Sequence, residues 1–361
     1  MKIRAFITHK KAERFKDCQD RFSINMDTKS VAVADGMSQS YQQKIWASLL
    51  VEQYTSHHDF VPNHESIKEL SAEWISKVKE FIENLKENGA PQYLVIMNEN
   101  SLVTQKSAGA TFLGIRFSGQ KWEGDVLGDS CLVEVKNGRI ERILTSQQED
   151  EFDNHPDYFD SGINKEGKGT PKIIDGVIDE NTKVLLVSDP FSDFLNEKKK
   201  IEEEGRFIAE ILQLTNHDEY EALVSRWRDE YGMHNDDSTL IIIEDDKNDM
   251  LNVVHSDDIN DLIEKERAIE NNEHNIAEKQ EIIENSVREN ESQKEMGVSV
   301  CEEPIVNSTE SKNVSVDEDE FIKEVHNAYD SLETRNRKNV PFRTIKLIIR
   351  KIFVKFKITR R

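Results

Sequence analysis

The chain has 361 residues, of which 36% are hydrophobic and 33% are charged, and its formal net charge is -22. Too few residues are apolar for one packed core along the whole length, and an acidic body lacks the basic face that enzymes of nucleic acids need, so we expect no DNA partner. The net charge is -16 over residues 1–245, -17 over residues 246–333 and +11 over residues 334–361. This asymmetry predicts a folded body at 1–245, an acidic linker at 246–335 and a basic tail at 336–361.

The cysteines and the apolar runs indicate a cellular compartment. Cys18, Cys131 and Cys301 lie far apart and show neither metal-ligand spacing nor a disulfide framework, which favours a reducing environment. The N-terminus lacks an apolar run of signal-peptide length, and no stretch approaches the roughly 18 apolar residues of a membrane span. We therefore expect a cytoplasmic protein.

The first half of the body alternates patterns typical of strands and helices. The apolar run over residues 30–35 ends in Asp-Gly, as a buried strand that enters a turn does. Apolar residues at helical spacing then predict helices around residues 45–54 and 67–81. Three runs typical of strands follow, at 109–117, 121–127 and 131–135.

The second half of the body continues this alternation. Asn137-Gly138 lies between two alternating runs, which predicts a β-hairpin because these residues accept the positive φ angles of a type I′ turn. Residues 146–180 are polar and contain Gly and Pro, which indicates a long surface loop. The remaining patterns predict a buried strand at 183–189, helices over 198–231 and a final strand at 238–244.

Beyond residue 245 the patterns weaken. Aliphatic residues recur every seven positions from Leu262 to Ile283, but their partner positions are mostly polar, which favours a solvated, marginal helix over a coiled coil. Residues 290–318 have the composition of disorder, and residues 321–332 predict one short amphipathic helix. Residues 341–357 predict a basic amphipathic helix. Three kinds of binding partner are open for this last helix. The first is the anionic inner surface of the cell membrane. The second is an acidic protein or the chain's own acidic body, and the third is RNA.

Aspartates stand at the ends of five predicted strands. A single acid there is usually a turn residue, and one at a helix start is usually a cap. Acids that gather at one end of a sheet, however, repel each other unless a cation lies among them. Oxygen ligands favour Mg²⁺ or Mn²⁺ as that cation. The residues are Asp20, Asp35, Asp129, Asp189 with Asp193, and Asp236 with Asp237.

Seven short motifs follow one another in the order of a known family. The chain resembles the metal-dependent Ser/Thr protein phosphatases of type 2C, the PPM family, and most closely its bacterial-type members. The resemblance covers residues 1–245 and no part of the chain beyond them. The motifs are CQD at 18–20, ADGM at 34–37, GAT at 109–111, GDS at 128–130, LT at 144–145, SD at 188–189 with Asp193, and DDST at 236–239.

The resemblance implies a fold and an activity. The fold is α+β, a four-layer α-β-β-α sandwich with two central antiparallel sheets. The activity is hydrolysis of phosphoserine and phosphothreonine in proteins through a centre of two Mn²⁺ or Mg²⁺ ions, with a third ion in bacterial-type members. Two ions about 4 Å apart lower the pKa of a shared water and neutralise the phosphoryl group that it attacks. The implied partners are a phosphorylated protein and an opposing Ser/Thr kinase.

The resemblance also implies roles for individual residues. Asp35 matches the position that bridges both ions, and the Gly36 carbonyl matches a further ligand. Asp189 and Asp236 match the remaining ligands of one ion, and Asp20 matches a residue that holds metal-bound water. A third, weaker metal site would use Asp129 with Asp189 or Asp193. Asp237 is interpreted as a turn residue.

Two departures from the family pattern keep rival functions open. The phosphate-binding Arg of the family is expected where Phe15 stands, so Arg14 is the candidate, through a one-residue bulge. Pro190 replaces a Gly, and its fixed φ is expected to alter the turn that carries Asp189. Both favour a pseudophosphatase, a module that binds phosphorylated partners without turnover, whereas the intact acids favour an enzyme. A phosphatase that acts on a small molecule or on a dedicated regulator is a second rival.

Overall fold

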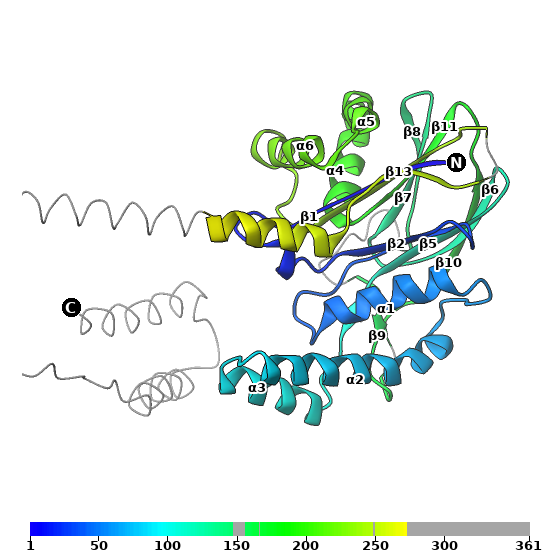
Figure 1. The fold of residues 1–361 in the computed structure, drawn as a ribbon. Helices are drawn as coiled ribbons and strands as arrows, with labels where there is room; N and C mark the ends of the chain where they lie inside the picture. Colours follow the sequence, from blue (N-terminus) through cyan, green and yellow to red (C-terminus); the bar gives the residue numbers. More distant parts are fainter. Residues whose placement is uncertain (147–155, 166, 248–249, 273–361) are drawn as a thin grey trace, which may run out of the picture. The chain divides into compact units, whose positions relative to one another are not determined.

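The computed structural model describes residues 1–146, 156–165, 167–247 and 250–272 (Figure 1). All of them belong to one compact unit, Met1–Ser286. The segment at 290–318, the helix at 321–332 and the basic tail at 336–361 lie outside the described residues. No helix within the described residues is both long enough and apolar enough to span a bilayer.

The larger sheet has six strands. They are β1 (Lys2–Thr8), β7 (Cys131–Lys136), β8 (Arg139–Leu144), β11 (Thr182–Val187), β12 (Ser238–Glu244) and β13 (Asn252–Ser256). Their order is β13-β1-β12-β11-β7-β8. Neighbours pair antiparallel, except that β13 runs parallel to β1. The family resemblance had implied a wholly antiparallel sheet. The parallel pairing of β13 with β1 corrects this expectation.

The second sheet has five strands, all antiparallel to their neighbours, in the order β10-β6-β5-β3-β2. They are β2 (Arg21–Asn25), β3 (Ser30–Ala34), β5 (Phe112–Ser118), β6 (Lys121–Leu127) and β10 (Lys172–Val177). A two-stranded ribbon joins β4 (Gly109–Ala110) to β9 (Phe159–Asp160). The runs predicted as strands at 30–35, 109–117, 121–127 and 131–135 are confirmed.

Helices cover the outer face of each sheet (Figure 1). On the five-stranded sheet lies α1 (Gln43–Ser56); α2 (His64–Glu87) packs against α1, and α3 (Gln92–Val103) packs against α2. The six-stranded sheet is covered by α4 (Asp189–Lys200), α5 (Glu204–Gln213) and α6 (His217–Glu230). Asn63 begins α2 with a capping box and Asn216 caps α6, each by accepting backbone N–H groups of the first turn. A short 3-10 helix spans Phe15–Asp17, and a further helix covers residues 259–272.

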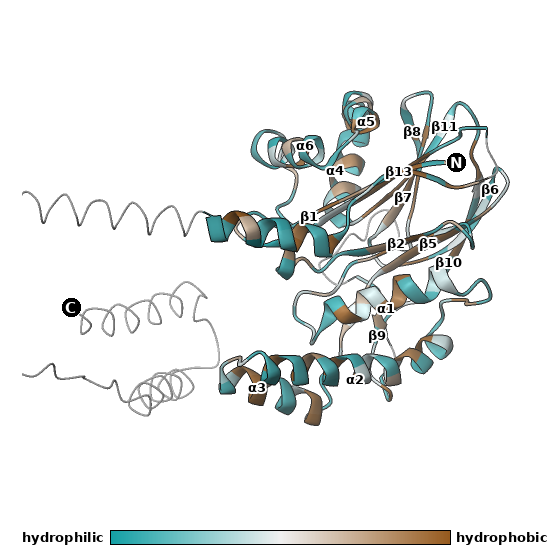
Figure 2. Ribbon diagram, viewed as in Figure 1, coloured by the Kyte–Doolittle hydropathy of each residue, from teal (hydrophilic) through white to brown (hydrophobic). Residues whose placement is uncertain are grey.

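Three buried clusters define the layers. Val33 and Ile115 of one sheet pack against Leu186 and Ile241 of the other. Further clusters bind each sheet to its own helices, for example through Trp227 of α6 on the six-stranded sheet. Figure 2 shows hydrophobic residues along the central strands and hydrophilic ones on the outer helix faces. The four-layer α-β-β-α sandwich is thereby confirmed.

The structure corrects two sequence predictions and confirms a third. Residues 146–180 are not one loop, because they contain β9 and β10. The folded unit also continues past residue 245, since β13 adds an edge strand and Leu262 of the next helix is 5% exposed. The hairpin at Asn137-Gly138 has φ angles of 50° and 75°, as a type I′ turn requires.

Candidate active site

The strand register brings distant acidic turns to one edge of the sandwich. Val187 at the end of β11 pairs with Leu240 on β12 and with Cys131 at the start of β7. The turns that carry Asp189, Asp236 and Asp129 therefore lie side by side. Asp35 follows β3 of the other sheet.

Electrostatic coupling shows that acids from both sheets meet. Burial raises the pKa of Asp35 well above its usual value, and the negative charges of Asp20, Asp189, Asp129 and Asp236 raise it further. The pKa of Asp189 is raised in the same way by burial and then by the charges of its acidic neighbours, Asp193 among them. We call these six residues the acid cluster: Asp20, Asp35, Asp129, Asp189, Asp193 and Asp236.

The acid cluster has the donor chemistry of a centre for hard cations. Asp20 is fully buried, whereas the other five acids are partly exposed to solvent. Oδ1 of Asp20 and Oδ1 of Asp129 are buried without a hydrogen-bond partner among the described residues, and such oxygens are the ligands that Mg²⁺ and Mn²⁺ prefer. No three acidic, His or Cys side chains of the described residues form a ready-made ligand set.

Asp20 is held by the last strand of the body. Thr239 Oγ1 donates a hydrogen bond of 2.7 Å to Asp20 Oδ2. Burial, and then the charge of Asp237, raise the pKa of Asp20 to about 7, although the hydrogen bond from Thr239 opposes the shift.

Asp237 fixes the loop before β12. Its two oxygens accept backbone N–H groups, from Lys10 at 3.0 Å and from Gln19 at 2.7 Å. With both oxygens engaged, Asp237 ties three segments together. Its interpretation as a turn residue stays a prediction, because both of these hydrogen bonds join segments far apart in the sequence.

Lys10 is a site residue that the sequence motifs missed. Its Nζ lies 2.9 Å from Asp236 Oδ1. Partial burial alone would lower the pKa of Lys10, but the hydrogen bond to Asp236 and the charges of Asp236 and Asp237 raise it. One signal in the sequence could have identified Lys10, namely its position just after the first strand. That strand ends at Thr8, which pairs with Ser238, the residue that follows Asp236 and Asp237.

Arg228 of α6 is a second missed residue. It donates to the carbonyl oxygens of His9, at 3.0 Å, and of Asp236, and to Ser238 Oγ at 3.0 Å. It thereby joins the loop that carries Lys10 to the loop that carries Asp236. Nothing in its local sequence marks it.

The ADGM motif is explained by close packing around Gly36. A Cβ on Gly36 would lie 2.9 Å from Gln43 Cγ and 3.2 Å from the Gln19 carbonyl oxygen, so a larger residue would force Gln43 to shift. The Asp35 N–H donates to Thr111 Oγ1 at 3.3 Å, and the Thr111 N–H donates back to the Asp35 carbonyl at 2.9 Å. The GAT motif therefore positions Asp35.

A family model decides the identification. The model described as Protein phosphatase 2C matches residues 10–227. The chain belongs to the protein phosphatase 2C family. It is accordingly a protein serine/threonine phosphatase, and enzymes of this family are generally metal-dependent.

Solved structures of phosphatases are similar to this protein phosphatase 2C chain. The S. agalactiae serine/threonine phosphatase is 16% identical, with 67% of this chain and 98% of that chain covered and a TM-score of 0.42. Stp1 from Staphylococcus aureus is 13% identical over 68% of this chain and 94% of its own, with a TM-score of 0.41. PppA of Pseudomonas aeruginosa is 13% identical over 67% and 96%, with a TM-score of 0.41. A search of curated proteins finds no match.

Pro190 lies in the first turn of the helix that carries Asp189 in this phosphatase. Asp189 is the first residue of α4 and Pro190 the second, with Ser188 as the N-cap. Proline is favoured in the first turn, where its missing N–H has no intrahelical partner. Pro190 therefore fits this helix start, and a turn that differs from that of the family stays a prediction. Asp193 lies within α4, so it is not the cap of a following helix.

Arg14 points to a different partner from the one that the family pattern suggested. Its Nη1 donates to Glu270 Oε2 at 3.0 Å, and its Nη2 lies 2.8 Å from Glu270 Oε1. Glu270 belongs to the helix at 259–272. Among the described residues, the lysine or arginine side chain that forms an ion pair with the acid cluster is Lys10.

Proposed function

We propose that this protein phosphatase 2C chain hydrolyses phosphoserine and phosphothreonine in proteins, using a two-ion centre of Mn²⁺ or Mg²⁺ in the acid cluster. The observation that carries the proposal is the meeting of carboxylates from both sheets at one edge, with buried oxygens of Asp20 and Asp129 unpartnered. When bound, the ions supply Lewis acidity and lower the pKa of a water molecule. A Ser/Thr kinase would supply the phosphorylated substrate.

Each residue would have a distinct task. Asp35, the Gly36 carbonyl, Asp189 and Asp236 would hold the two ions. Asp129 would hold a third ion together with Asp189 or Asp193. Asp20 Oδ1 would accept a hydrogen bond from water, because its other oxygen is held by Thr239.

Positive charge for the substrate's phosphate would come from Lys10. Its Nζ lies 2.9 Å from Asp236 and 3.4 Å from Ser38 Oγ, at the partly exposed edge of the acid cluster. Arg14 could take this task only after release from Glu270. That ion pair is the observation that favours the rival function, a pseudophosphatase that binds phosphorylated partners without turnover.

The test is hydrolysis of p-nitrophenyl phosphate and of a phosphothreonine peptide by the full chain. We expect turnover with Mn²⁺ or Mg²⁺ and none with EDTA. Asp35→Asn and Asp236→Asn should each lower kcat/KM by about 100-fold or more, as loss of a group that stabilises transition-state charge does. Asp175→Asn is the matched control, because Asp175 is exposed on β10 outside the acid cluster.

The outcomes separate the two functions. Full activity in Asp35→Asn and Asp236→Asn would contradict the assignment of the metal ligands. A folded wild-type chain that binds Mn²⁺, binds the phosphopeptide and turns over neither substrate would establish the pseudophosphatase.

A further inference from the structure

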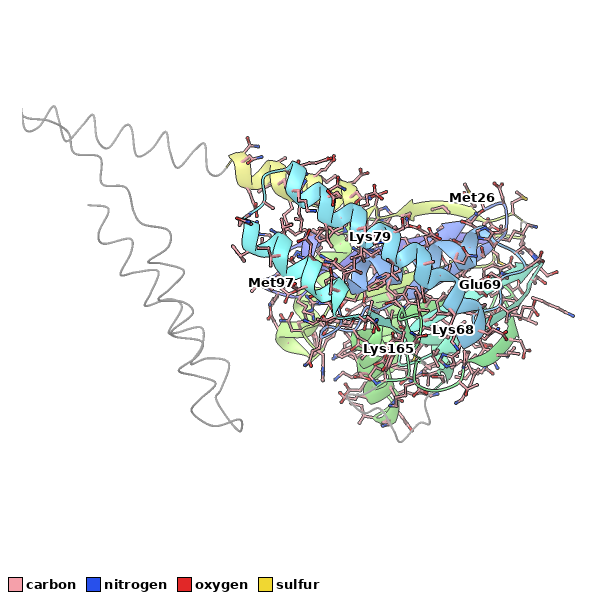
Figure 3. All side chains as sticks on the ribbon, turned by 90° about the horizontal axis from the view of Figure 1, so that it is seen from below. Met26, Lys68, Glu69, Lys79, Met97 and Lys165 are labelled. Carbon is pink, nitrogen blue, oxygen red and sulfur yellow. The ribbon has the colours of Figure 1, made fainter. Side chains whose placement is uncertain are left out.

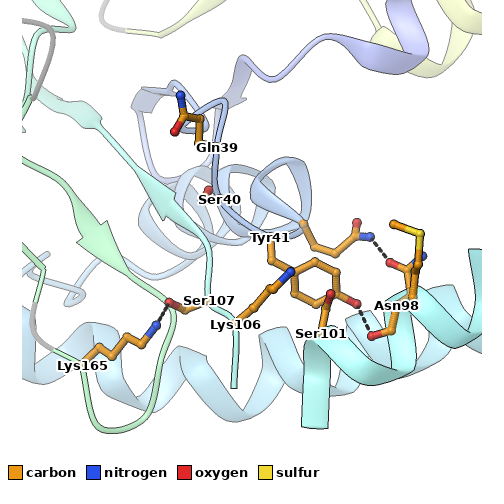
Figure 4. A pocket seen from close by; sticks show the side chains of 10 residues that line it. Gln39, Ser40, Tyr41, Asn98, Ser101, Lys106, Ser107 and Lys165 are labelled. Carbon is orange, nitrogen blue, oxygen red and sulfur yellow. Dashed lines mark hydrogen bonds between the residues drawn. The ribbon is translucent and has the colours of Figure 1, made fainter. Parts of the chain in front are cut away.

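A cleft of about 450 Å³ opens beside the chain segment that leaves Asp35 (Figure 4). One wall is the segment Gln39–Gln42, and the opposite wall includes Met97 and Asn98 of α3. Hydrogen bonds hold these walls together. Tyr41 Oη donates to the Asn98 carbonyl at 3.0 Å, and Gln42 Nε2 donates to Asn98 Oδ1 at 3.0 Å. The cleft is therefore a preformed feature of the fold.

The lining of the cleft carries positive charge without a matching negative charge. Lys106 and Lys165 both line it, and no Asp or Glu does. Lys165 Nζ donates to Ser107 Oγ at 2.8 Å, and Ser107 Oγ donates to Asp160 Oδ2 at 3.2 Å behind the lining. Within the described ranges, neither lysine forms an ion pair. In a chain of net charge -22, a cleft with two unpaired lysines favours an acidic ligand.

Backbone hydrogen bonds connect the cleft to the acid cluster. Thr111 N donates to the Asp35 carbonyl and Met37 N to that of Gly109; after a turn in which Ser40 N donates to the Met37 carbonyl, Tyr41 N donates to that of Ser107. The four residues from Ser107 to Thr111, beside Asp35, span at most about 13 Å. A peptide with its phosphorylated residue at Asp35 would thus place a residue three to five positions away over Lys106 and Lys165.

The helix beside the cleft adds an apolar contact surface. Of the residues of α3, only Val95 is buried, while Met97 is 61% and Tyr93 63% exposed. Figure 3 shows Met97 and Lys165 from the side that α2 and α3 cover. Exposed aromatic and Met side chains next to a charged cleft are typical of surfaces that bind peptides.

We propose that this cleft docks the substrate, and that Lys106 and Lys165 bind an acidic group three to five residues from the phosphoserine or phosphothreonine. The acidic group is a carboxylate or a second phosphate, since both pair with lysine. The inference rests on the proposed function and adds the substrate class: phosphoproteins with acidic residues around the phosphorylated position.

The test compares phosphothreonine peptides that carry Glu, Gln or phosphoserine at positions three to five on either side of the phosphothreonine. For the wild-type full chain we expect the Glu or phosphoserine peptide to exceed the Gln peptide in kcat/KM by about three- to tenfold, as two exposed ion pairs allow. The Glu and phosphoserine arms identify which acid is preferred. In Lys106→Glu/Lys165→Glu this preference should vanish or reverse, while hydrolysis of p-nitrophenyl phosphate stays unchanged.

The control is Lys79→Glu, a charge reversal at an exposed lysine of α2 outside the cleft lining (Figure 3). It should keep the wild-type preference. Equal kcat/KM for Glu, Gln and phosphoserine peptides in the wild type would overturn the docking site. So would a preference that persists in the double variant.

Peptide binding separates this inference from the proposed function. Fluorescence anisotropy of labelled Glu and Gln peptides measures docking even if no substrate is turned over. Tighter binding of the Glu peptide by the wild type, lost in the double variant, would support the cleft in a chain without phosphatase activity. Equal binding of the two peptides would refute it.

Discussion

His217, at the start of α6, connects that helix to the segment after β13. Its Nδ1 lies 2.9 Å from Asp257 Oδ2, and its Nε2 lies 3.5 Å from Glu221 Oε1. Asp257 also accepts the Ile7 N–H at 2.9 Å and contacts His255 at 3.0 Å. Burial alone would lower the pKa of His217, but the hydrogen bonds to Asp257 and Glu221 raise it to about 9.

This raised pKa predicts a pH-dependent contribution to stability. The pKa of His217 is higher in the folded chain than its value of 6.5 in the unfolded chain, so protonated His217 stabilises the fold. This stabilisation is fully present below pH 6.5 and disappears as the pH rises to about 9. His217→Gln should therefore lower the free energy of unfolding by about 2 kcal/mol at pH 6, and much less at pH 9. Urea unfolding at several pH values measures the difference. His58→Gln, at an exposed histidine, is the control, and a constant deficit across this pH range would contradict the assignment.

At the residue scale, the sequence was most informative where a motif fixes the backbone. Asp35 and Gly36 could be named as candidates because the ADGM motif ends a run that is apolar from Val31 to Ala34. Lys10 and Arg228 could not, because their contacts depend on β1 pairing with β12 across the length of the domain. A pairing of such long range leaves no local pattern.

At the scale of elements, the helix at 259–272 secures the loop before Asp20. Leu262 packs with Ile7, Phe15 and Cys18 in a separate small cluster. Glu266 Oε2 accepts the Phe15 N–H at 3.2 Å, one turn before Glu270 binds Arg14. The helix is thus a structural part of the phosphatase domain.

Two substitutions in that helix test its contribution. Leu262→Ala should destabilise the domain by about 2–3 kcal/mol, because it removes a buried Leu side chain from the cluster. Ile269→Ala is the matched control, since Ile269 is 59% exposed and should change stability by less than about 0.5 kcal/mol. Chemical denaturation of both variants measures this. Equal effects would show that the helix is not docked.

The strands β10 and β13 were not predicted from the sequence, and in both the reason is a weak local pattern of apolar residues. In β10, Ile173 is exposed and Ile174 is buried. Two adjacent isoleucines do not give the alternation of apolar and polar residues that marks a half-buried strand in the sequence. β13 is a short edge strand with a partner, β1, that lies at the other end of the domain sequence. Its alternation of exposed and half-buried residues is weak, so only pairing with β1 defines it.

At the scale of the molecule, the acid cluster joins the two sheets. Asp35 comes from the five-stranded sheet, whereas Asp189 and Asp236 come from turns of the six-stranded one. Mutual repulsion among these carboxylates opposes the packed state. An ion bound by all three residues would link the sheets and stabilise the fold by mass action.

Thermal unfolding should report this linkage. At a Mn²⁺ concentration 100 times its Kd, the free energy of unfolding should rise by about 2.7 kcal/mol, and EDTA should reverse the gain. Asp35→Asn should lose most of the increase while its own melting temperature without metal is no lower than that of the wild type. An unchanged melting temperature with Mn²⁺ in the wild type would argue against ions at this edge.

The position of β1 between β12 and β13 has a consequence for synthesis on the ribosome. β1 ends at Thr8 and β12 begins at Ser238, so about 230 residues are made between them, which takes roughly 12–46 s at ordinary rates of translation. During that interval β1, a nearly fully buried strand, has no partner in its sheet. Asp35, which is synthesised early, likewise lies in an incomplete acid cluster until Asp236 has been synthesised. A nascent chain would therefore acquire its catalytic centre only when its last strands emerge.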